Sequence, residues 1–269
     1  FVSGATTLTN VDFISNTASP GSGGGAYISS TATLEHVHFD SNSAVRYSGY
    51  GGYGGGLFAQ HVWSISGTIF ANNTASKGGG MCVREISFIT NTIFVGNSAH
   101  AGGGGMIASS NIATITNAFF ARNTSPAIYL DAGTQTRIVH TTIVSPTLVN
   151  SPAIEVIYNS NNAHVYIIDT IIANHNVAVK NATGKFSGTT TEDYNLFYDN
   201  ITNTLGSIIS GGHSLVGDPK FIDPANDDYH LGPGSAAIDA GVDVSIDTDL
   251  DGNPRPVNFG FDIGAYEYQ

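Results

Sequence analysis

Ile65-Ser-Gly-Thr-Ile-Phe70-Ala-Asn-Asn73-Thr-Ala-Ser-Lys-Gly78-Gly-Gly80-Met-Cys-Val83 is the stretch that decides the fold of this chain. It contains the pattern Phe-x-x-Asn, an aliphatic residue five positions before the Phe, and a glycine run followed by apolar residues. The same pattern occurs at Phe13–Asn16, Phe39–Asn42, Phe70–Asn73, Phe94–Asn97 and Phe120–Asn123. The Phe residues are 26, 31, 24 and 26 positions apart, and a period of this size indicates stacked repeats.

Each position of the repeat has a physical role in a stack of coils. The short runs rich in Ile, Val, Thr, Phe and Tyr, without a sustained 3.6-residue period, predict strands. Coils of about 25 residues fit a parallel β-helix, in which equivalent residues lie roughly 4.8 Å apart. The Phe side chains would stack inside, the Asn side chains would form a hydrogen-bonded ladder, and the glycines would allow positive φ at a corner. A leucine-rich repeat, the main competing solenoid, would need a Leu-x-x-Leu-x-Leu core that this sequence lacks.

The repeat changes in the second half of the chain. Ser125-Pro-Ala-Ile128 and Ser151-Pro-Ala-Ile154 stand where the earlier glycine runs stood. We expect Ile143, Ile172 and Phe197 to continue the inward stack. The prediction is therefore an all-β, right-handed parallel β-helix of about eight coils that ends in a turn-rich cap.

The start of the chain also carries register information. Phe1 and Tyr27 each lie 12 residues before a repeat Phe, so the chain opens inside a coil with no polar cap before it. An uncapped coil exposes its core and its strand edges. This start either reflects a fragment or docks on another copy of the chain, and a head-to-tail contact that does not close produces filaments.

The acidic charge is concentrated in residues 215–269, which we expect to cap the β-helix formed by residues 1–214. Residues 218–269 contain 11 of the 21 acidic residues, and their many Gly, Pro and Asp residues favour ordered turns. Arg255 is predicted to pair with Asp262 or Glu267. The apolar residues expected to cover the last open coil are Ile238, Ile263, Tyr266 and Tyr268.

Three alternating carboxylates and a glycine form the pattern of a calcium-binding loop: Asp247, Asp249, Asp251 and Gly252. Ca²⁺ prefers several oxygen ligands from alternate positions, and the glycine permits a sharp turn between them. Asn258 stands at loop position 12, where an EF-hand needs an acidic residue, so Asp243 or Asp262 would have to complete the site. The alternative is a solvated acidic turn.

Two parts of the chain resemble bacterial surface proteins. The Phe-x-x-Asn and Gly-Gly-x repeats of residues 1 to about 130 resemble those of the polymorphic outer-membrane protein family and related secreted β-helix proteins. Residues 215–269 contain Leu215-Val-Gly-Asp-Pro-Lys-Phe221, Gly234-Ser-Ala-Ala-Ile-Asp-Ala-Gly241 and Asp262-Ile-Gly-Ala-Tyr-Glu-Tyr268. They resemble the C-terminal module of choice-of-anchor Q proteins, which commonly precedes an anchoring tail. The resemblances imply an extracellular β-helix at a bacterial surface.

An insertion in the second coil carries a set of tyrosines on a Gly-rich segment, residues 46–53. The candidate contact residues are Tyr47, Tyr50 and Tyr53, together with the nearby Trp63. Such rings stack on sugar rings or on a partner protein. The alternative is an exposed loop whose tyrosines fold back on the coil.

Composition narrows the range of functions. Only 11% of the residues are charged, against about 25% in typical domains, so Ser, Thr and Asn must supply the surface polarity, as in many secreted proteins. Nine basic residues and a formal net charge of −12 argue against a nucleic-acid partner. No apolar stretch reaches the length of a transmembrane helix. Cys82 is expected to be a buried thiol.

The expected function is structural or adhesive. The alternative is a lyase or glycoside hydrolase, or an inactive relative that binds polysaccharide. Glycoside hydrolysis needs two facing carboxylates. The repeat region offers few charged candidates for chemistry: Asp12, Glu35, Asp40, Arg84, Glu85, Arg122, Asp131 and Arg137.

Overall fold

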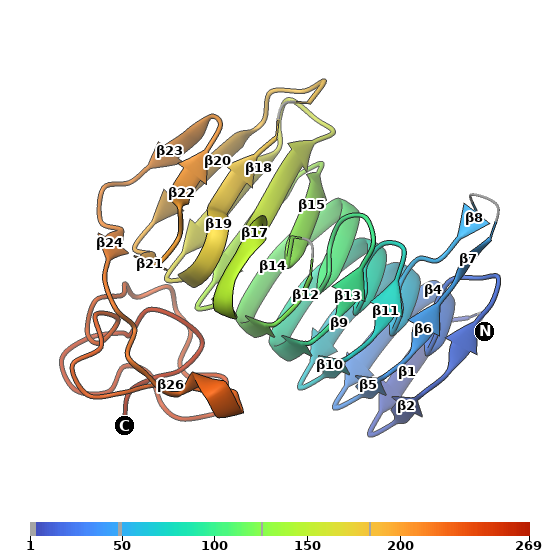
Figure 1. The fold of residues 1–269 in the computed structure, drawn as a ribbon, viewed down its shortest axis with the longest axis horizontal. Helices are drawn as coiled ribbons and strands as arrows, with labels where there is room; N and C mark the ends of the chain where they lie inside the picture. The colour runs from blue at the N-terminus through green and yellow to red at the C-terminus, as the bar shows by residue number, and fades with distance from the viewer. Residues whose placement is uncertain (1–3, 48–49, 125, 183) are drawn as a thin grey trace.

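The computed structural model describes residues 4–47, 50–124, 126–182 and 184–269 (Figure 1). These residues form a parallel β-helix of about eight turns with 56% of the chain in strands, which confirms the predicted fold class. The coils stack along a rod, and the chain after β24 folds into a lobe beside the last coils. No helix in these ranges is long and apolar enough to cross a membrane. The predictions made for Phe1 and for the position of Ser125 lie outside the described residues.

Within the described residues, one 18-stranded sheet winds around the rod. Its strands are β1 (Thr6–Thr9), β2 (Asp12–Ile14), β4 (Ala26–Glu35), β5 (His38–Asp40), β9 (Leu57–Ser66), β10 (Ile69–Ala71), β12 (Met81–Val95), β14 (Met106–Ala121), β15 (Ile128–Ala132), β16 (Gln135–Val139), β17 (Thr142–Tyr158), β18 (His164–Ile168), β19 (Ile171–Asn181), β20 (Thr189–Asp193), β21 (Leu196–Tyr198), β22 (Thr202–Leu205), β23 (Ile208–Ser210) and β24 (Leu215–Val216). A second parallel ladder contains β3 (Thr17–Ala18), β6 (Ser43–Ala44), β11 (Thr74–Ala75) and β13 (Ser98–Ala99). Two antiparallel pairs complete the set: β7 (Arg46–Tyr47) with β8 (Tyr50–Gly51), and β25 (Phe221–Asp223) with β26 (Asp228–Leu231), the latter joined through the 3-10 turn η1 (Pro224–Asn226).

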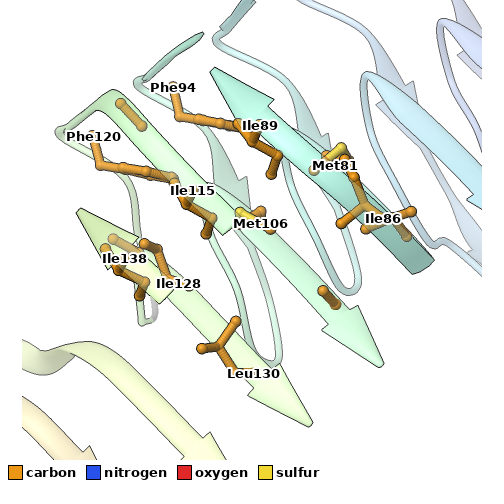
Figure 2. Close-up of a cluster of buried hydrophobic side chains, with 14 of the residues drawn as sticks. Met81, Ile86, Ile89, Phe94, Met106, Ile115, Phe120, Ile128, Leu130 and Ile138 are labelled. Atoms are coloured by element: carbon orange, nitrogen blue, oxygen red, sulfur yellow. The ribbon is translucent and has the colours of Figure 1, made fainter. Parts of the chain in front are cut away.

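The main sheet gives the rod three faces, which we number first, second and third in chain order. The long strands β12 and β14 bend at the corners and contribute to all three faces. One pair of residues on each face shows the register between these strands: Met81 with Met106, Ile89 with Ile115, and Phe94 with Phe120. Figure 2 shows these side chains in successive layers of the buried core.

The repeat Phe residues form the predicted internal stack. In chain order, the ring centroids of Phe13, Phe39, Phe70, Phe94 and Phe120 are 4.9, 4.9, 4.8 and 4.5 Å apart, with interplanar angles of 6° or less. As predicted, the same register continues through Ile143, Ile172 and Phe197. These distances match the spacing between paired strands. The same shift along the rod axis from one coil to the next therefore allows both ring stacking and backbone pairing.

The repeat Asn residues form the predicted ladder, which contains Asn16, Asn42, Asn73, Asn97 and Asn123. Asn73 Oδ1 accepts hydrogen bonds from the backbone N–H (2.9 Å) and side-chain amide (3.0 Å) of Asn42. Its Nδ2 donates to Asn97 Oδ1 (3.0 Å) and to the carbonyl oxygen of Phe39 (2.9 Å). Asn73 is fully buried, so the ladder satisfies polar groups that burial would otherwise leave unpaired.

The ladder is interrupted in the later coils and resumes at Asn200. Pro146 and His175 occupy the two intervening Asn positions. Asn200 lies three residues after Phe197, accepts the backbone N–H of His175 (2.9 Å) and donates to the carbonyl oxygen of Ile172 (2.8 Å). These bonds repeat those of the earlier ladder. Sequence reasoning missed this further Phe-x-x-Asn copy because the two preceding coils lack the Asn.

Residues with positive φ mark three corners of the coils, and one set lies two residues after each repeat Phe: Ser15, Ser41, Asn72, Gly96 and Arg122. In the glycine run, Gly54 has a φ of 64°, and a Cβ atom there would lie 2.1 Å from the carbonyl oxygen of Leu57, so this position requires glycine. Between the second and third faces, one residue per coil is left-handed with φ between 44° and 56°. We call these the corner residues: Asn10, His36, Gly67, Asn91, Asn117, His140, Asp169 and Tyr194. No sequence motif indicates the corner residues.

Residues 217–269, the C-terminal segment, are turn-rich as predicted, but they pack on the outside of the third face. Tyr229 and Tyr266 of the segment lie against Phe119, with ring centroids 5.2 and 6.1 Å apart. Ile263 is buried with Ile171. The reason is that the outward positions of the third strands are apolar in these coils, and a strand that is apolar on both sides requires cover on both sides.

The last coil is not covered by the residues that the structure describes. Val216 occupies the register position next to Phe197 and is 78% exposed. Leu205 and Leu215 are also exposed. The four residues predicted to cover this coil therefore lie beside the rod instead of over its end: Ile238, Ile263, Tyr266 and Tyr268.

Candidate binding groove

A groove with a volume of about 320 Å³ runs along the second face, near its corner with the first. Backbone pairing places Thr31 beside His61 and His61 beside Glu85. The groove therefore crosses successive coils and follows the rod axis. Its lining residues are Thr31, His61, Val62, Trp63, Glu85, Ile86, Ser87, Ala113 and Thr134.

Trp63, which lines the groove, and Phe88, which contacts it, form an exposed aromatic platform. Val62 points into the core and is 3% exposed, whereas the next residue of β9, Trp63, is 60% exposed. Phe88 of β12 is 45% exposed, and its ring meets Trp63 edge-on at 6.0 Å with an interplanar angle of 74°. Both rings stand on strands that have a paired neighbour on either side, and the register of β9 against β4 shifts at Trp63. Exposed apolar surface of this kind marks binding sites.

His61 and Glu85 supply polar atoms beside the platform. His61 Nδ1 lies 2.9 Å from Glu85 Oε2, and the two side chains are 51% and 43% exposed. A pair this exposed contributes little to stability. The contact uses one nitrogen and one carboxylate oxygen, so His61 Nε2 and Glu85 Oε1 remain available to a ligand.

A second hollow of about 240 Å³ lies on the first face, on the other side of the same corner. Tyr53 lines it and tilts against Phe58 at a centroid distance of 6.3 Å. Arg84 Nη1 donates to Gln60 Oε1 at 3.4 Å within this hollow. Cys82 is buried there as predicted, and burial raises the pKa of its thiol to about 12.

The structure thus separates the aromatic residues predicted from the sequence. Tyr53 belongs to the hollow and Trp63 to the groove. The backbones of Tyr47 and Tyr50 pair in the β7–β8 hairpin, but their side chains, with residues 48–49, lie outside what the structure describes. Glu85 as the partner of His61 was missed in the sequence. The 24-residue spacing that separates Phe70 from Phe94 also separates these two side chains.

Comparison with known proteins does not assign a function to the groove. No family model, curated protein or solved structure matches this chain. The resemblance to polymorphic outer-membrane proteins and to the choice-of-anchor Q module therefore stays a prediction.

The predicted calcium loop is a turn organised by Asp249. Asp249 Oδ1 accepts the backbone N–H groups of Asp251 (3.0 Å) and Asn253 (2.8 Å). Its Oδ2 accepts the N–H of Glu267 (3.0 Å) and the side-chain amide of Asn253 (3.2 Å). Asp247 is exposed, and Asp251 Oδ2 lies 2.7 Å from a histidine nitrogen of β26. Across the described ranges, no three His, Cys, Asp or Glu side chains are arranged to hold a metal ion. Calcium binding stays an untested prediction.

Arg255 pairs with Glu267, one of its two predicted partners. Arg255 Nη1 lies 3.0 Å from Glu267 Oε2, and both side chains are fully buried. The guanidinium also donates to the carbonyl oxygens of Asp262 (3.0 Å) and Gly264 (2.8 Å). The carboxylate of Asp262 accepts backbone N–H groups of the segment instead of the guanidinium. Arg255 therefore holds several turns of the C-terminal segment together.

Corner residues of three successive coils attach the C-terminal segment to the rod. Asn117 Nδ2 donates to a carbonyl oxygen of the segment at 2.7 Å. His140 Nδ1 lies 3.3 Å from Arg255 Nη1. Asp169 Oδ1 accepts a backbone N–H of the segment at 3.0 Å. The polar side chains at one repeated corner thus bond to the segment that covers them, two to its backbone and His140 to the side chain of Arg255.

Burial displaces the pKa values of two of these corner residues in opposite directions. It lowers the pKa of His140 to about 3 and raises that of Asp169 to about 7. His140 Nε2 and Asp169 Oδ2 are 3.9 Å apart and have no hydrogen-bond partner. Because His140 is neutral at pH 7, this contact is not an ion pair. Both side chains are fully buried, so their titration affects stability and not a substrate.

Proposed function

We propose that this chain is a non-catalytic, extracellular adhesive protein of a bacterial surface, whose rod carries a binding groove on one side. The observation that carries the proposal is the pair of exposed rings of Trp63 and Phe88, which stand on strands with a paired neighbour on each side. Aromatic side chains supply much of the binding energy at interfaces and lose little conformational entropy there. The low charge of the chain and the resemblance of its repeats to secreted surface proteins support the location.

Two features favour adhesion over catalysis. The most displaced pKa values include those of His140 and Asp169, which lie beneath the C-terminal segment, whereas catalytic acids and bases lie in accessible clefts. Of the described residues that line the groove, Glu85 is the one carboxylate. The usual mechanism of glycoside hydrolysis uses two.

An adsorption experiment tests this proposal. The protein is passed over sensors coated with bacterial polysaccharides, plant cell-wall polysaccharides or collagen, and soluble products are assayed in the same flow. We expect saturable adsorption to at least one coating without release of reducing sugars or unsaturated oligosaccharides. Protein-dependent release of such products would favour the alternative, a polysaccharide lyase or hydrolase. If the protein adsorbs to none of the coatings, the adhesive proposal is contradicted.

End-on self-association is a second candidate function, and the last coil favours it. Leu205, Leu215 and Val216 are exposed on strands at the end of the sheet, and residues 200–217 contain no Asp, Glu, Lys or Arg. Natural proteins usually protect such edges with charge. Because each coil repeats the strand register of the one before, a coil of a second copy is the partner that fits this end. Light scattering and electron microscopy test this: fibres or discrete oligomers support it, and a monomer at high concentration contradicts it.

A further inference from the structure

The geometry points to a ligand for the groove: a neutral, unbranched polysaccharide that lies along the rod axis. This inference rests on the proposed adhesive function and specifies what the protein adheres to. It is carried by the direction of the groove, the chemistry of its lining residues and the pairing of the strands beneath them.

The shape of the groove fits a chain molecule. Its lining extends from Thr31 through His61 and Glu85 to Ala113 and Thr134, which belong to five successive coils. Four coil spacings correspond to roughly 19 Å. A single sugar ring would occupy a fraction of this length, whereas several linked rings would fill it.

Strand pairing argues against an extended peptide as the ligand. Peptides commonly bind to β-proteins by adding a strand to an open sheet edge, where their backbone gains hydrogen bonds. Beneath the groove, β9 and β12 are already paired on both sides, β9 with β4 and β12 with β14. A ligand in the groove therefore lies on strands that already have a paired neighbour on each side, and it meets mainly side chains.

The side chains in the groove match the two kinds of surface that a sugar presents. The platform of Trp63 and Phe88 offers an apolar surface on which the C–H face of a pyranose ring can stack. Hydroxyl groups of Thr31, Ser87 and Thr134 can both donate and accept hydrogen bonds, as the hydroxyl groups of a sugar do. This combination of aromatic and hydroxyl side chains suits a saccharide better than a lipid chain, which would leave the hydroxyl groups without hydrogen-bond partners.

Charge favours a neutral polymer. Glu85 lies in the groove and would repel carboxylate or sulfate groups on a ligand. The basic residue next to it, Arg84, lies in the hollow around the corner and donates to Gln60. The net charge of −12 adds a longer-range repulsion toward acidic polymers.

Affinity measurements on matched variants test the inference. The intact protein is titrated by calorimetry with soluble β-glucan, mannan and xylan as neutral polymers, and with polygalacturonate and hyaluronate as acidic ones. We expect saturable binding to at least one neutral polymer and at least tenfold weaker binding to both acidic ones. Trp63→Ala should weaken binding of the neutral polymer at least tenfold, and Trp63→Phe should restore most of it.

Phe259→Ala is the control variant. Phe259 is also an exposed ring, at 98%, but it lies in the C-terminal segment, away from the groove. This variant should bind within about twofold of the unaltered protein, because stacking contributes only where a ligand contacts the ring. Since Trp63 and Phe259 are exposed, both variants should keep the circular dichroism spectrum and melting temperature of the parent protein.

Three results would overturn the inference. They are the absence of binding to all neutral polymers, equal affinities of Trp63→Ala and the unaltered protein, and acidic polymers binding as tightly as neutral ones. The adhesive proposal has a separate readout. If Trp63→Ala adsorbs to the coated sensors as well as the parent protein does, adhesion stands and uses another surface of the rod.

Discussion

The first coils and the later coils share the same inner repeat but differ on the outside of the third face. In the first two coils, three of the four residues that flank the stacked Phe are polar, namely Asp12, His38 and Asp40, and the fourth is the exposed Ile14. In the later coils the flanking positions are apolar and buried, as at Ile171 and Ala173. The inner positions therefore build the coil, whereas the outer positions decide whether the third face is exposed to solvent or is covered by the C-terminal segment.

The two regions also differ in how their coils are held together. The first coils carry the continuous Asn ladder, and the later ones replace the Asn with Pro146 and His175 before it resumes. There the C-terminal segment contributes bonds to Asn117, His140 and Asp169. The hydrogen bonds of the Asn ladder stabilise the first coils. The C-terminal segment, which we call the clasp, adds to the stability of the later coils.

The largest effect is expected when the clasp is broken at Arg255. Arg255→Ala leaves the buried carboxylate of Glu267 without its partner, and we expect a loss of about 3–5 kcal/mol in the free energy of unfolding. Urea denaturation followed by fluorescence measures it. The control is Arg122→Ala, because Arg122 pairs with Asp227 at 2.7 Å on the surface of the same interface. That variant should lose about 1 kcal/mol or less, and equal losses in the two variants would contradict the account.

The contribution of Asp169 to the free energy of unfolding should depend on pH. Burial raises the folded pKa of Asp169 from the ordinary value of 3.8 to about 7, so the folded state binds an extra proton between these pH values and loses stability as pH rises through that window. The lowered pKa values of His140 and His175 act in the opposite direction, so the effect must be isolated by a variant.

Asp169→Asn removes this titration and keeps an acceptor for the backbone N–H that Asp169 binds. Relative to the unaltered protein, it should gain stability steadily from pH 4 to above pH 7, by a total on the order of 4 kcal/mol. Chemical denaturation at intervals of one pH unit measures the difference. A difference that does not change with pH would show that Asp169 does not titrate in this range.

Within the first coils, the interior of the Asn ladder should matter more than its edge. Asn73→Ala removes the hydrogen bonds to two neighbouring coils in a fully buried site, and we expect a loss of about 2–4 kcal/mol. Asn16 is exposed, and among the described residues it donates to Asn42 alone, so Asn16→Ala should lose about 1 kcal/mol or less. Thermal melts of the two variants compare them directly. Similar losses would mean that the ladder does not carry the stability assigned to it.

The smallest effect is expected for calcium. Both oxygens of Asp249 already accept hydrogen bonds from the chain, so the turn has partners without a metal. We expect the same melting temperature with excess calcium and with a chelator. A melting temperature that rises with calcium would establish the loop of Asp247, Asp249 and Asp251 as a metal site that supports the clasp.

The sequence predicted the inside of the rod better than its outside. A fixed period places Phe70 on Phe94 and Asn73 on Asn97, because parallel pairing repeats each inward position. The position of the C-terminal segment depends on outward positions. The consecutive apolar residues Phe119-Phe120-Ala121 and Ile171-Ile172-Ala173 signalled burial on both sides, but the period alone does not show what provides the cover.

The candidate site was predictable in part. Trp63 was identified because an aromatic residue near a Gly-rich insertion suggests contact with a ligand. The neighbouring Glu85 and Phe88 come from another coil, and only the register across the corner places them beside His61 and Trp63. The corner residues were missed because left-handed positions filled by Asn, His, Asp and Tyr share no side-chain chemistry that a motif could show.

The most direct measurement uses the fluorescence of Trp63, which is the only Trp in the chain. Its emission therefore reports on the groove on the second face and on no other surface. Adding a neutral polysaccharide should shift the emission to shorter wavelength in a saturable manner, because a stacked sugar excludes water from the ring. Binding of the polymer, established by calorimetry, with no change in Trp63 emission would contradict the assignment of this groove as the adhesive site.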